Sequence, residues 1–507
     1  MSQSLGAFDI VVVGAGMAGA LIAASLAEQG RTVLMLDAGL PPELSDDTAA
    51  SSHGLVEALA TEDSNGHADY RQLALPRHPH TAGPLGSSDV PGGGSTWPRL
   101  GSVPRMLPGD FAMRSRYGVG VDWPIGYGDL EPWYGRAEEA LGVAGNHEHV
   151  DGLHGAYRTT RFPLTEIWPS HSDLVVERAL AGKAFEGVDL TVLRTPLAHH
   201  SNAHDRTVFV KQALTAKVPA QLRARATVTR IVASESGVVR RVEILADGRT
   251  WTAEGRAVVV AAHAIETPRL LLASGLANRS GQVGRNLMDH ATGTGSIVAR
   301  MPMFPFPGPP STSGIEAFRD GDFRRERAAF RLSLGNAGPG LAAPPEGAGL
   351  RPVRESNLGP GRRFQVNAST EILPDEFNAV RLREGQREQG LPAVDVYFSP
   401  SSYTRAGYLH AEKVMRAIFE HVGFVGEPPR FDPNASADTS SGHFMGTCRM
   451  GSSPSTSVVD ADCRTHDHPN LFIAGASLFT TGGTASPTLT VVALALRLAA
   501  HLQRWLR

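Results

Sequence analysis

Cysteine is nearly absent from this chain, which has only Cys448 and Cys463 among its 507 residues. Two thiols cannot build a disulfide framework, and they are too few to hold an iron–sulfur cluster. Unpaired cysteines are typical of proteins from reducing compartments. The sequence therefore predicts a cytoplasmic protein.

A charge excess and a long hydrophobic run are also missing. The formal net charge is −3, which gives no electrostatic attraction to nucleic acid or to an anionic membrane. No uninterrupted apolar run is long enough to span a bilayer. The first residues also lack a basic segment followed by a signal-length apolar core. We expect no nucleic-acid partner and no membrane segment.

The strongest positive pattern lies between Ile10 and Asp37. A short apolar run at its start fits a buried parallel strand, and an alanine-rich helix pattern follows. Gly14, Gly16 and Gly19 join the two in GxGxxG spacing. A second apolar run ends at Asp37. Strand, glycine turn, helix, strand and acid in this order are typical of a dinucleotide-binding βαβ unit.

Each of these residues has a physical role in such a unit. Gly14 permits the tight turn, Gly16 lets the backbone approach a pyrophosphate, and Gly19 lets helix and strand pack closely. The helix N-terminus offers free N–H groups and a positive dipole end to the phosphates. Asp37 is placed to accept hydrogen bonds from a ribose diol.

Elements of the same kind recur in the middle and at the end of the chain. Periodicity and turn residues predict the following segments. Strands are expected at 228–232, 238–245, 249–252, 257–262, 364–382, 392–398 and before Gly475, and helices at 127–142, 264–274, 401–422 and 487–506. The sequence between the dinucleotide-binding segments must fold outward as a separate layer. We expect one domain from residues 1–154, 221–300 and 441–507, and a substrate domain from 155–220 and 301–440.

The ordered blocks resemble those of the glucose–methanol–choline (GMC) oxidoreductases, which are FAD-dependent flavoenzymes. Four blocks carry this resemblance, which covers nearly the full chain: residues 11–37, 92–124, 262–290 and 442–497. The second and fourth look most like the large subunits of glucose, gluconate and sorbitol dehydrogenases. The resemblance implies an α/β fold with a Rossmann-type FAD-binding domain, assembled from discontinuous segments. Beside it we expect an α+β substrate domain with an antiparallel sheet.

Two departures from that branch change the expectations. The relatives carry a cysteine cluster where this chain has LAHHSNAHDRT at residues 197–207, so an internal electron relay is not expected. Some family members attach FAD covalently to a histidine that follows Ser-Thr. Here Ser95-Thr96 is followed by Trp97, so we expect FAD to be bound without a covalent link.

The resemblance implies a general base at His443, in the segment SGHFMGTCRMG. A neutral imidazole suits the removal of a hydroxyl proton, because its pKa lies near working pH. Relatives have Asn or His at the second catalytic position, where this chain has Ser486. The Ser486 hydroxyl can face the substrate oxygen, or it can cap the last helix by accepting from the N–H of Leu489. We favour the cap, and the sequence leaves both readings open.

The same resemblance carries the cofactor contacts over. Gly14, Gly16 and Gly19 would hold the pyrophosphate, and Asp37 the adenosine ribose. The other expected FAD contacts are Gly93, Gly94, Ser95, Val228, Ala262, Gly475, Ala476, Thr484 and Ala485. Asp289-His290 matches a family motif that we interpret as structural support. The histidines of residues 199–204 lie in a polar loop without a second cluster of ligands, so no metal site is expected.

Together these patterns predict an FAD-dependent oxidoreductase acting on the CH–OH group of a sugar or polyol-like substrate. His443 would remove the proton, and an external acceptor would reoxidise the flavin. A dehydrogenase is favoured over an oxidase, and the resemblance leaves room for a small accessory subunit. The alternatives are the same chemistry on an alkyl, aromatic or sterol alcohol, or a redox-silent FAD-binding homologue.

Overall fold

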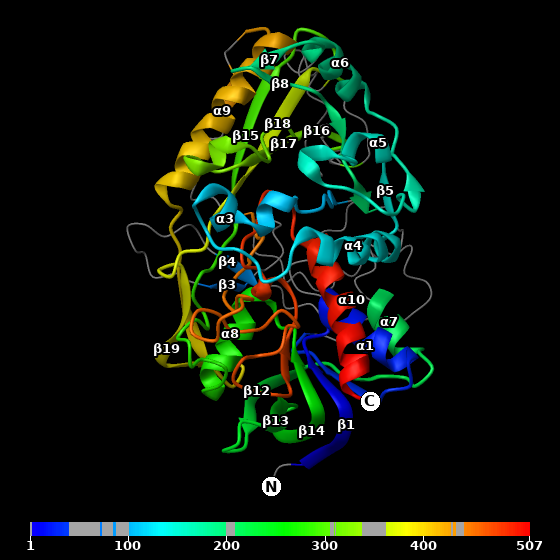
Figure 1. Ribbon diagram of the computed structural model, residues 1–507, viewed down its shortest axis with the longest axis vertical. Helices are drawn as coiled ribbons and strands as arrows, with labels where there is room; N and C mark the ends of the chain where they lie inside the picture. Colours follow the sequence, from blue (N-terminus) through cyan, green and yellow to red (C-terminus); the bar gives the residue numbers. More distant parts are fainter. Residues whose placement is uncertain are drawn as a thin grey trace, which may run out of the picture.

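The computed structural model describes residues 3–39, 101–198, 208–304, 309, 311–336, 361–426, 429–431 and 441–507, and the backbone of residues 71–73 and 85–87. Two large sheets organise this part of the chain (Figure 1). A seven-stranded sheet lies at the end of the molecule that holds both termini. A six-stranded sheet lies at the opposite end.

The seven-stranded sheet is built around β1 (Gln3–Val13), whose apolar end is fully buried. β1 pairs in parallel with β2 (Val33–Leu36) on one side and with β14 (Arg249–Val260) on the other. β11 (Gln221–Arg223) extends the sheet beyond β2, and β22 (Leu471–Ile473) pairs in parallel with the end of β14. The antiparallel strands β13 (Val239–Ala246) and β12 (Ala226–Ala233) complete it.

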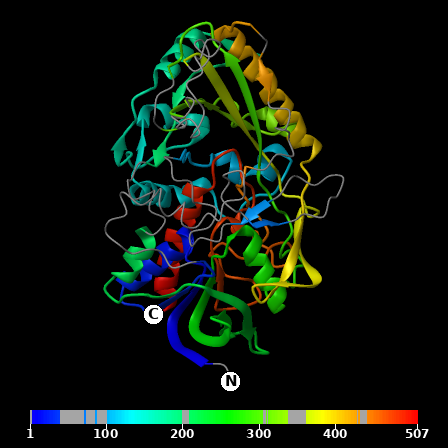
Figure 2. The ribbon, with the colours of Figure 1, turned by 180° about the vertical axis from the view of Figure 1, so that it is seen from behind.

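Helices cover this sheet on two sides. α1 (Met17–Glu28) contacts α10 (Thr488–Trp505) and α7 (Val208–Leu214), and α10 also contacts α4 (Tyr127–Leu141). α8 (His263–Ser274) contacts β12 and lies on the other side of β14, as Figures 1 and 2 both show. The ends and the middle of the chain thus share one hydrophobic core.

The six-stranded sheet is antiparallel throughout. Its strands, in spatial order, are β21 (Arg430–Phe431), β15 (His290–Val298), β18 (Arg363–Glu371), β17 (Phe330–Leu334), β16 (Ser313–Ile315) and β9 (Leu193–Arg194). The long helix α9 (Ser402–Val422) packs on three of these strands, and α6 (His171–Leu180) packs on α9. These elements surround a second hydrophobic core.

Shorter elements connect the two sheets. The short helices are η2 (Pro108–Phe111), α3 (Met113–Tyr117), α5 (His147–Val150), η3 (Leu153–Gly155), η5 (Asp322–Arg325) and η6 (Ala476–Leu478). The remaining strands are β3 (Arg71–Leu73), β4 (Leu85–Ser87), β5 (Val143–Gly145), β6 (Leu164–Thr165), β7 (Ala184–Phe185), β8 (Val188–Asp189), β10 (Leu197–Ala198), β19 (Ala379–Glu388) and β20 (Leu391–Tyr397).

The expected fold class is confirmed, but several element predictions need correction. Residues 249–252 and 257–260 belong to the single strand β14. Its first half pairs with β13 and its last residues lie between β1 and β22. Residues 364–382 form two strands, because Pro374 and a turn at Asp375 interrupt them. β3 and β4 pair in an antiparallel arrangement, and the sequence patterns predicted neither strand.

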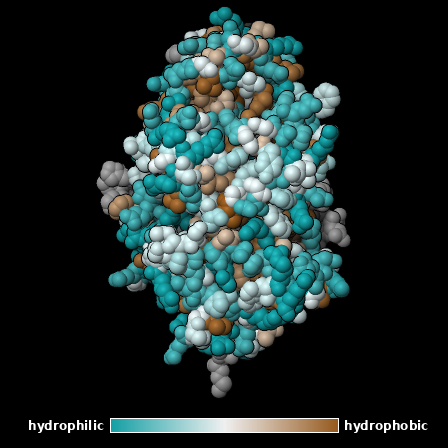
Figure 3. Space-filling model, viewed as in Figure 1, coloured by the Kyte–Doolittle hydropathy of each residue, from teal (hydrophilic) through white to brown (hydrophobic). Residues whose placement is uncertain are grey.

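The domain boundaries remain a prediction. One observation bears on them: β15 begins at His290, inside the segment expected in the FAD-binding domain, and joins the six-stranded sheet. Hydrophilic residues cover most of the surface visible in Figure 3. Within the described residues, no helix combines the length and apolarity needed to cross a membrane.

Candidate FAD and alcohol site

Four neighbouring strands of the seven-stranded sheet end at the same edge. Val13 of β1 is in register with Leu36 of β2 and with Val260 of β14, and Val260 is in register with Ile473 of β22. The residues that follow these positions therefore lie side by side. They include four of the expected cofactor residues, namely Gly14, Asp37, Ala262 and Gly475. The carboxyl edge of a parallel sheet is where α/β proteins bind nucleotides.

The glycine turn at this edge has the geometry that the sequence predicted. Gly14 has φ +98°, and a Cβ there would lie 2.5 Å from the carbonyl oxygen of Ala261. A Cβ on Gly19 would overlap the carbonyl oxygen of Gly14 and lie 3.0 Å from Cγ1 of Val12. These glycines therefore let β1, α1 and the end of β14 approach one another closely.

The N-terminus of α1 is arranged to receive an anion. Its N-cap residue is Gly16, which has no side chain to cap the helix, and the first turn contains no acidic residue. The N–H groups at this end keep their positive potential, which suits a pyrophosphate. The donor set of this turn therefore fits the predicted dinucleotide.

Asp37 lies directly beside the glycine turn. Its Oδ2 accepts a hydrogen bond from the N–H of Ala15 at 2.7 Å, and Oδ1 accepts from the N–H of Gly39 at 2.8 Å. Burial raises the pKa of Asp37 despite these hydrogen bonds. Each oxygen retains a second lone pair for a ribose hydroxyl. The N–H of Ala226 donates to the Asp37 carbonyl at 2.8 Å, so β12 starts beside Asp37 and Val228 is its third residue.

The expected contacts Gly93, Gly94 and Ser95 lie outside the described residues, as does Trp97. The histidines of residues 199–204 also fall outside them. Within the part of the chain that the structure describes, no cluster of His, Cys, Asp and Glu could hold a metal ion.

The residues that follow β22 form hydrogen bonds with the segment that contains His443. The N–H of Gly446 donates to the Ala476 carbonyl at 3.1 Å, and the N–H of Cys448 donates to the Ser477 carbonyl at 2.9 Å. Gly475 has φ +95°, which a glycine adopts without strain. These contacts bring His443 and the strand end with Gly475 and Ala476 into one region.

His443 forms a pair with His290, the first residue of β15. Their Nδ1 atoms lie 2.9 Å apart, and the two rings meet edge to face at 84°. The other ring nitrogen of His290, Nε2, lies 2.9 Å from the carbonyl oxygen of Gly483. Gly483 is followed directly by Thr484 and Ala485, the residues expected beside the flavin. A chain of hydrogen bonds thus links the expected base to the expected flavin contacts.

Asp289 holds the loop that carries His443. Its carboxylate accepts from the N–H of His443 at 2.9 Å, of Ser441 at 3.1 Å and of Gly442 at 3.3 Å, and also from the Ser441 hydroxyl. The N–H of His290 donates to the same carboxylate at 2.7 Å. The side chain of Asp289 is fully buried. One carboxylate therefore fixes the backbone of both histidines.

Burial sets the charge state of the histidine pair. Burial, together with the neighbouring His443, lowers the pKa of His290 to about 3. Burial also lowers the pKa of His443, although the charge of Asp289 opposes this. Both imidazoles are consequently neutral near pH 7, as a base for a hydroxyl proton requires.

The structure contradicts the predicted role of Ser486 as a helix cap. α10 begins at Thr488, its N-cap position is Pro487, and no side chain caps it. Among the described residues, the half-buried Ser486 hydroxyl has no hydrogen-bond partner. Pro487 occupies the position before the first helical turn, so the helix does not use the serine. Its hydroxyl is left for another role.

Sequence reasoning missed a buried cation at this site, Arg319. Its Nε donates to the Thr484 hydroxyl at 3.0 Å, its Nη1 donates to Glu316 at 3.0 Å, and its Nη2 donates to the Arg105 carbonyl at 2.7 Å. Arg319 lies outside the four blocks that carry the resemblance and outside every element that periodicity predicted. Asp289 and His290 were identified by a family motif, but the sequence could not show that their side chains contact the loop of His443.

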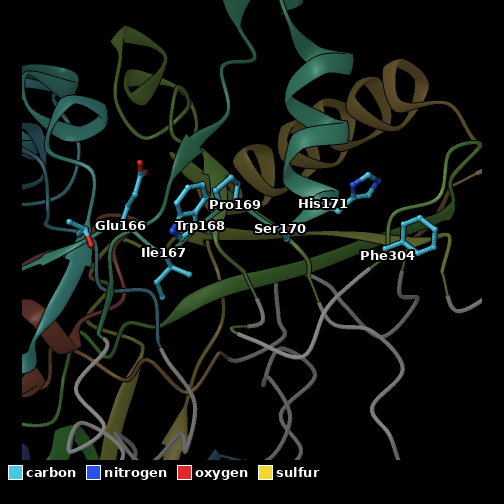
Figure 4. A pocket seen from close by; sticks show the side chains of 8 residues that line it. Glu166, Ile167, Trp168, Pro169, Ser170, His171 and Phe304 are labelled. Carbon is cyan, nitrogen blue, oxygen red and sulfur yellow. The ribbon is translucent and has the colours of Figure 1, made fainter.

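A separate surface pocket contains none of the predicted site residues. Its volume is about 490 Å³, and it is lined by residues 165–171 and Phe304 (Figure 4). Trp168 and Phe304, two of its side chains, are 88% and 61% exposed. Trp168 belongs to the segment before α6, far along the chain from β1, β14 and β22. The pocket therefore shares no lining residue with the site at the sheet edge.

Comparisons with known proteins agree with the geometry of the sheet edge. Residues 122–292 and 374–495 each match a family model described as GMC oxidoreductase, and residues 9–81 match one described as FAD binding domain. FAD is therefore the cofactor that the glycine turn, the α1 N-terminus and Asp37 would hold.

Two relatives match over almost their whole length. The chain is 30% identical to the fructose dehydrogenase large subunit of Gluconobacter japonicus, covering 98% of each chain. It is 28% identical to the 2-methyl-1,2-propanediol dehydrogenase of Mycolicibacterium austroafricanum, covering 99% of this chain and 96% of that one. A crystal structure of pyridoxine 4-oxidase from Mesorbium loti has the same fold, with a TM-score of 0.65, 22% identity and coverage of 98% and 99%. By the two family models and the full-length relative, the chain belongs to the GMC oxidoreductase family.

Proposed function

We propose that this protein oxidises the CH–OH group of a sugar or polyol-like alcohol, with FAD as its cofactor. FAD, when bound, supplies the hydride acceptor for such a reaction. The observation that carries the proposal is the His443–His290–Gly483 chain of hydrogen bonds. It ends beside Thr484 and Ala485, where the resemblance places the flavin. The names of the fructose and propanediol dehydrogenases support a polyhydroxylated substrate.

We assign separate roles in proton removal, substrate binding and cofactor binding to residues of this chain. His443 takes the hydroxyl proton at Nε2, the ring nitrogen that has no hydrogen-bond partner among the described residues. Ser486 offers its hydroxyl to the substrate oxygen, because α10 does not use it. Proton removal by a positioned base contributes ~10²–10⁴-fold to the rate. Gly14, Gly16, Gly19 and Asp37 hold the adenosine diphosphate part of the cofactor.

We propose a dehydrogenase, with an external acceptor that reoxidises the enzyme. Both relatives described above carry dehydrogenase names, although other relatives of nearly full length carry oxidase names. The name of the first relative also describes it as a large subunit, which supports the proposal of a small accessory subunit. Cytoplasmic location and FAD binding without a covalent link stay predictions from cysteine content and from Trp97.

Anaerobic reduction of the bound FAD tests this function. We expect D-fructose or D-sorbitol to abolish the visible flavin absorbance, and benzyl alcohol or 1-octanol to do so slowly or not at all. His443→Ala should retain FAD and reduce it ~10²-fold or more slowly. His171→Ala is the matched control, because its exposed ring lines the separate pocket, and its rate should equal that of the wild type.

The other outcomes identify the alternatives. Reduction by benzyl alcohol or 1-octanol alone would assign the protein to apolar alcohols. No reduction by any alcohol, with FAD bound, would indicate a redox-silent homologue. Hydrogen peroxide formation at the rate of turnover, after oxygen is admitted, would indicate an oxidase. A wild-type rate in His443→Ala would remove this histidine from the mechanism.

A further inference from the structure

Each ring nitrogen of His290 has one hydrogen-bond partner, and the two partners differ in whether they can donate a proton. Nε2 lies 2.9 Å from the carbonyl oxygen of Gly483, and Nδ1 lies 2.9 Å from Nδ1 of His443. A carbonyl oxygen can only accept a hydrogen bond. Nε2 of the neutral His290 ring must therefore carry the proton and donate it to Gly483, and Nδ1 is left with a lone pair.

This arrangement determines the proton on the neighbouring ring. The lone pair at Nδ1 of His290 can only accept, so Nδ1 of His443 must donate a proton to it. A neutral imidazole has one ring proton, and Nε2 of His443 is consequently unprotonated. The opposite tautomer would place two lone pairs 2.9 Å apart at the contact between the two Nδ1 atoms.

We propose that His290 is a positioning residue that holds His443 with its proton on Nδ1 and its lone pair on Nε2. This inference rests on the proposed function, because it explains how His443 is ready to accept a hydroxyl proton. When the substrate O–H bond breaks, the new N–H bond forms at Nε2. The Nδ1 proton stays in place and donates a stronger, charge-assisted hydrogen bond to His290.

The surroundings of His290 keep its ring in one orientation. His290 is fully buried, and its low pKa keeps it neutral while His443 gains a proton. A Cβ added to Gly482 would lie 3.8 Å from Nε2 of His290, so the turn at residues 482–483 lies against the ring. The Asp289 carboxylate also accepts a hydrogen bond from the backbone N–H of His290, which fixes the start of β15. A histidine held in this way can fix the tautomer and orientation of the imidazole beside it, as hydrogen-bond partners do for metal-binding histidines.

Flavin reduction by D-fructose, measured under anaerobic conditions at full FAD occupancy, provides a first test. We expect His290→Leu to slow reduction ~10²-fold with little change in apparent substrate affinity. His290→Asn, whose side-chain oxygen can accept at the position of Nδ1, should recover most of this loss. His468→Leu is the matched control. His468 is a buried histidine whose ring also lies between backbone groups, those of Gly237 and Ala277, so its loss should lower stability but not the reduction rate.

A double-mutant cycle separates positioning from a general structural effect. If His290 acts through His443, adding His290→Leu to His443→Ala should leave the reduction rate of His443→Ala unchanged. A further ~10²-fold loss in the double variant would overturn the inference. A wild-type rate in His290→Leu, with His443→Ala slow, would overturn it while leaving the proposed function intact.

Histidine tautomers provide a test that does not depend on turnover. Two-bond ¹H–¹⁵N correlation spectra of ¹⁵N-histidine-labelled holoenzyme, at pH 8, should show one ring that is lost in His443→Ala and carries its proton on Nδ1. In His290→Leu that ring should no longer be held in this tautomer. A His443 ring protonated on Nε2 in the wild type would refute the inference, even if His443→Ala proves to be inactive.

Discussion

At the site, the side chain of Asp289 accepts hydrogen bonds from several backbone N–H groups at once. Its buried carboxylate accepts from three consecutive N–H groups, those of Ser441, Gly442 and His443, and from the N–H of His290. A carboxylate can accept all of these because it carries about four lone-pair sites and no proton. An amide of the same shape has only one oxygen, and its NH₂ group would face N–H donors.

Asp289→Asn should therefore destabilise the protein and disorganise the His443 loop. We expect a loss of ~2–4 kcal/mol in unfolding free energy, because buried donors lose a charged acceptor. Thermal melting of the holoenzyme measures the loss, and anaerobic flavin reduction measures the effect on the base. Asp322→Asn is the control, because that side chain is 94% exposed. Equal melting temperatures for the two variants would contradict the role assigned to Asp289.

Helix α1 and strand β1 form the closest contact between secondary-structure elements at the cofactor edge. α1 starts three residues after Gly14, and its third residue, Gly19, packs on Val12. The contact is possible only without a Cβ, because an added carbon would overlap the Gly14 carbonyl. The helix N-terminus is thereby held against the sheet edge, where the pyrophosphate is expected.

Gly19→Ala should push α1 away from β1 and weaken FAD binding. Overpacking of this kind costs ~1–3 kcal/mol, and it displaces the helix N-terminus that offers its N–H groups to the phosphates. The FAD content of the purified protein and the dissociation constant of FAD measure the effect. Gly30→Asn is the control, since Gly30 lies just after α1 with open space around it, and asparagine tolerates its positive φ better than most residues. Normal FAD affinity in Gly19→Ala would contradict this packing role.

The βαβ unit also shows which features the sequence determines. Strand, turn and helix could be predicted because apolar periodicity and three glycines are local signals, and the structure has them within a few residues. The pairing of Val13 with Val260 and of Val260 with Ile473 joins residues hundreds of positions apart. The recurring patterns and the resemblance predicted that these segments share a domain, but neither gave the register of their strands. Ser486 shows the opposite error, because a serine before Pro487 looks like a cap and the structure has none.

The His290–His443 contact could not be predicted from local signals either. The two residues lie 153 positions apart, and the orientation of two rings depends on packing that no local pattern encodes. Arg319 is a similar case. It lies outside every element that periodicity predicted, and only the folded chain brings its side chain to Thr484.

Across the whole molecule, Arg319 links the segment beside the six-stranded sheet to the expected flavin contacts. It donates to the Thr484 hydroxyl and to the Arg105 carbonyl. Glu316 pairs with both Arg319 and Arg331, at 3.0 and 2.6 Å. Burial opposes the ionisation of Glu316, but Arg331 and Arg319 hold its pKa below the ordinary value. Of these charged groups, the Arg319 guanidinium donates directly to the Thr484 hydroxyl, so its positive charge lies beside the expected flavin contacts.

Arg319→Met should lower the midpoint potential of the bound FAD. Reduction adds negative charge to the cofactor, and a nearby buried cation favours that charge. We expect a decrease of ~30 mV, which corresponds to ~1.4 kcal/mol for a two-electron couple. Arg319→Lys, which keeps the charge, should stay near the wild-type potential. Arg325→Met is the control, because its side chain is 57% exposed. Anaerobic titration against a redox dye measures all four proteins, and an unchanged potential in Arg319→Met at full FAD occupancy would show that the flavin does not sense this charge.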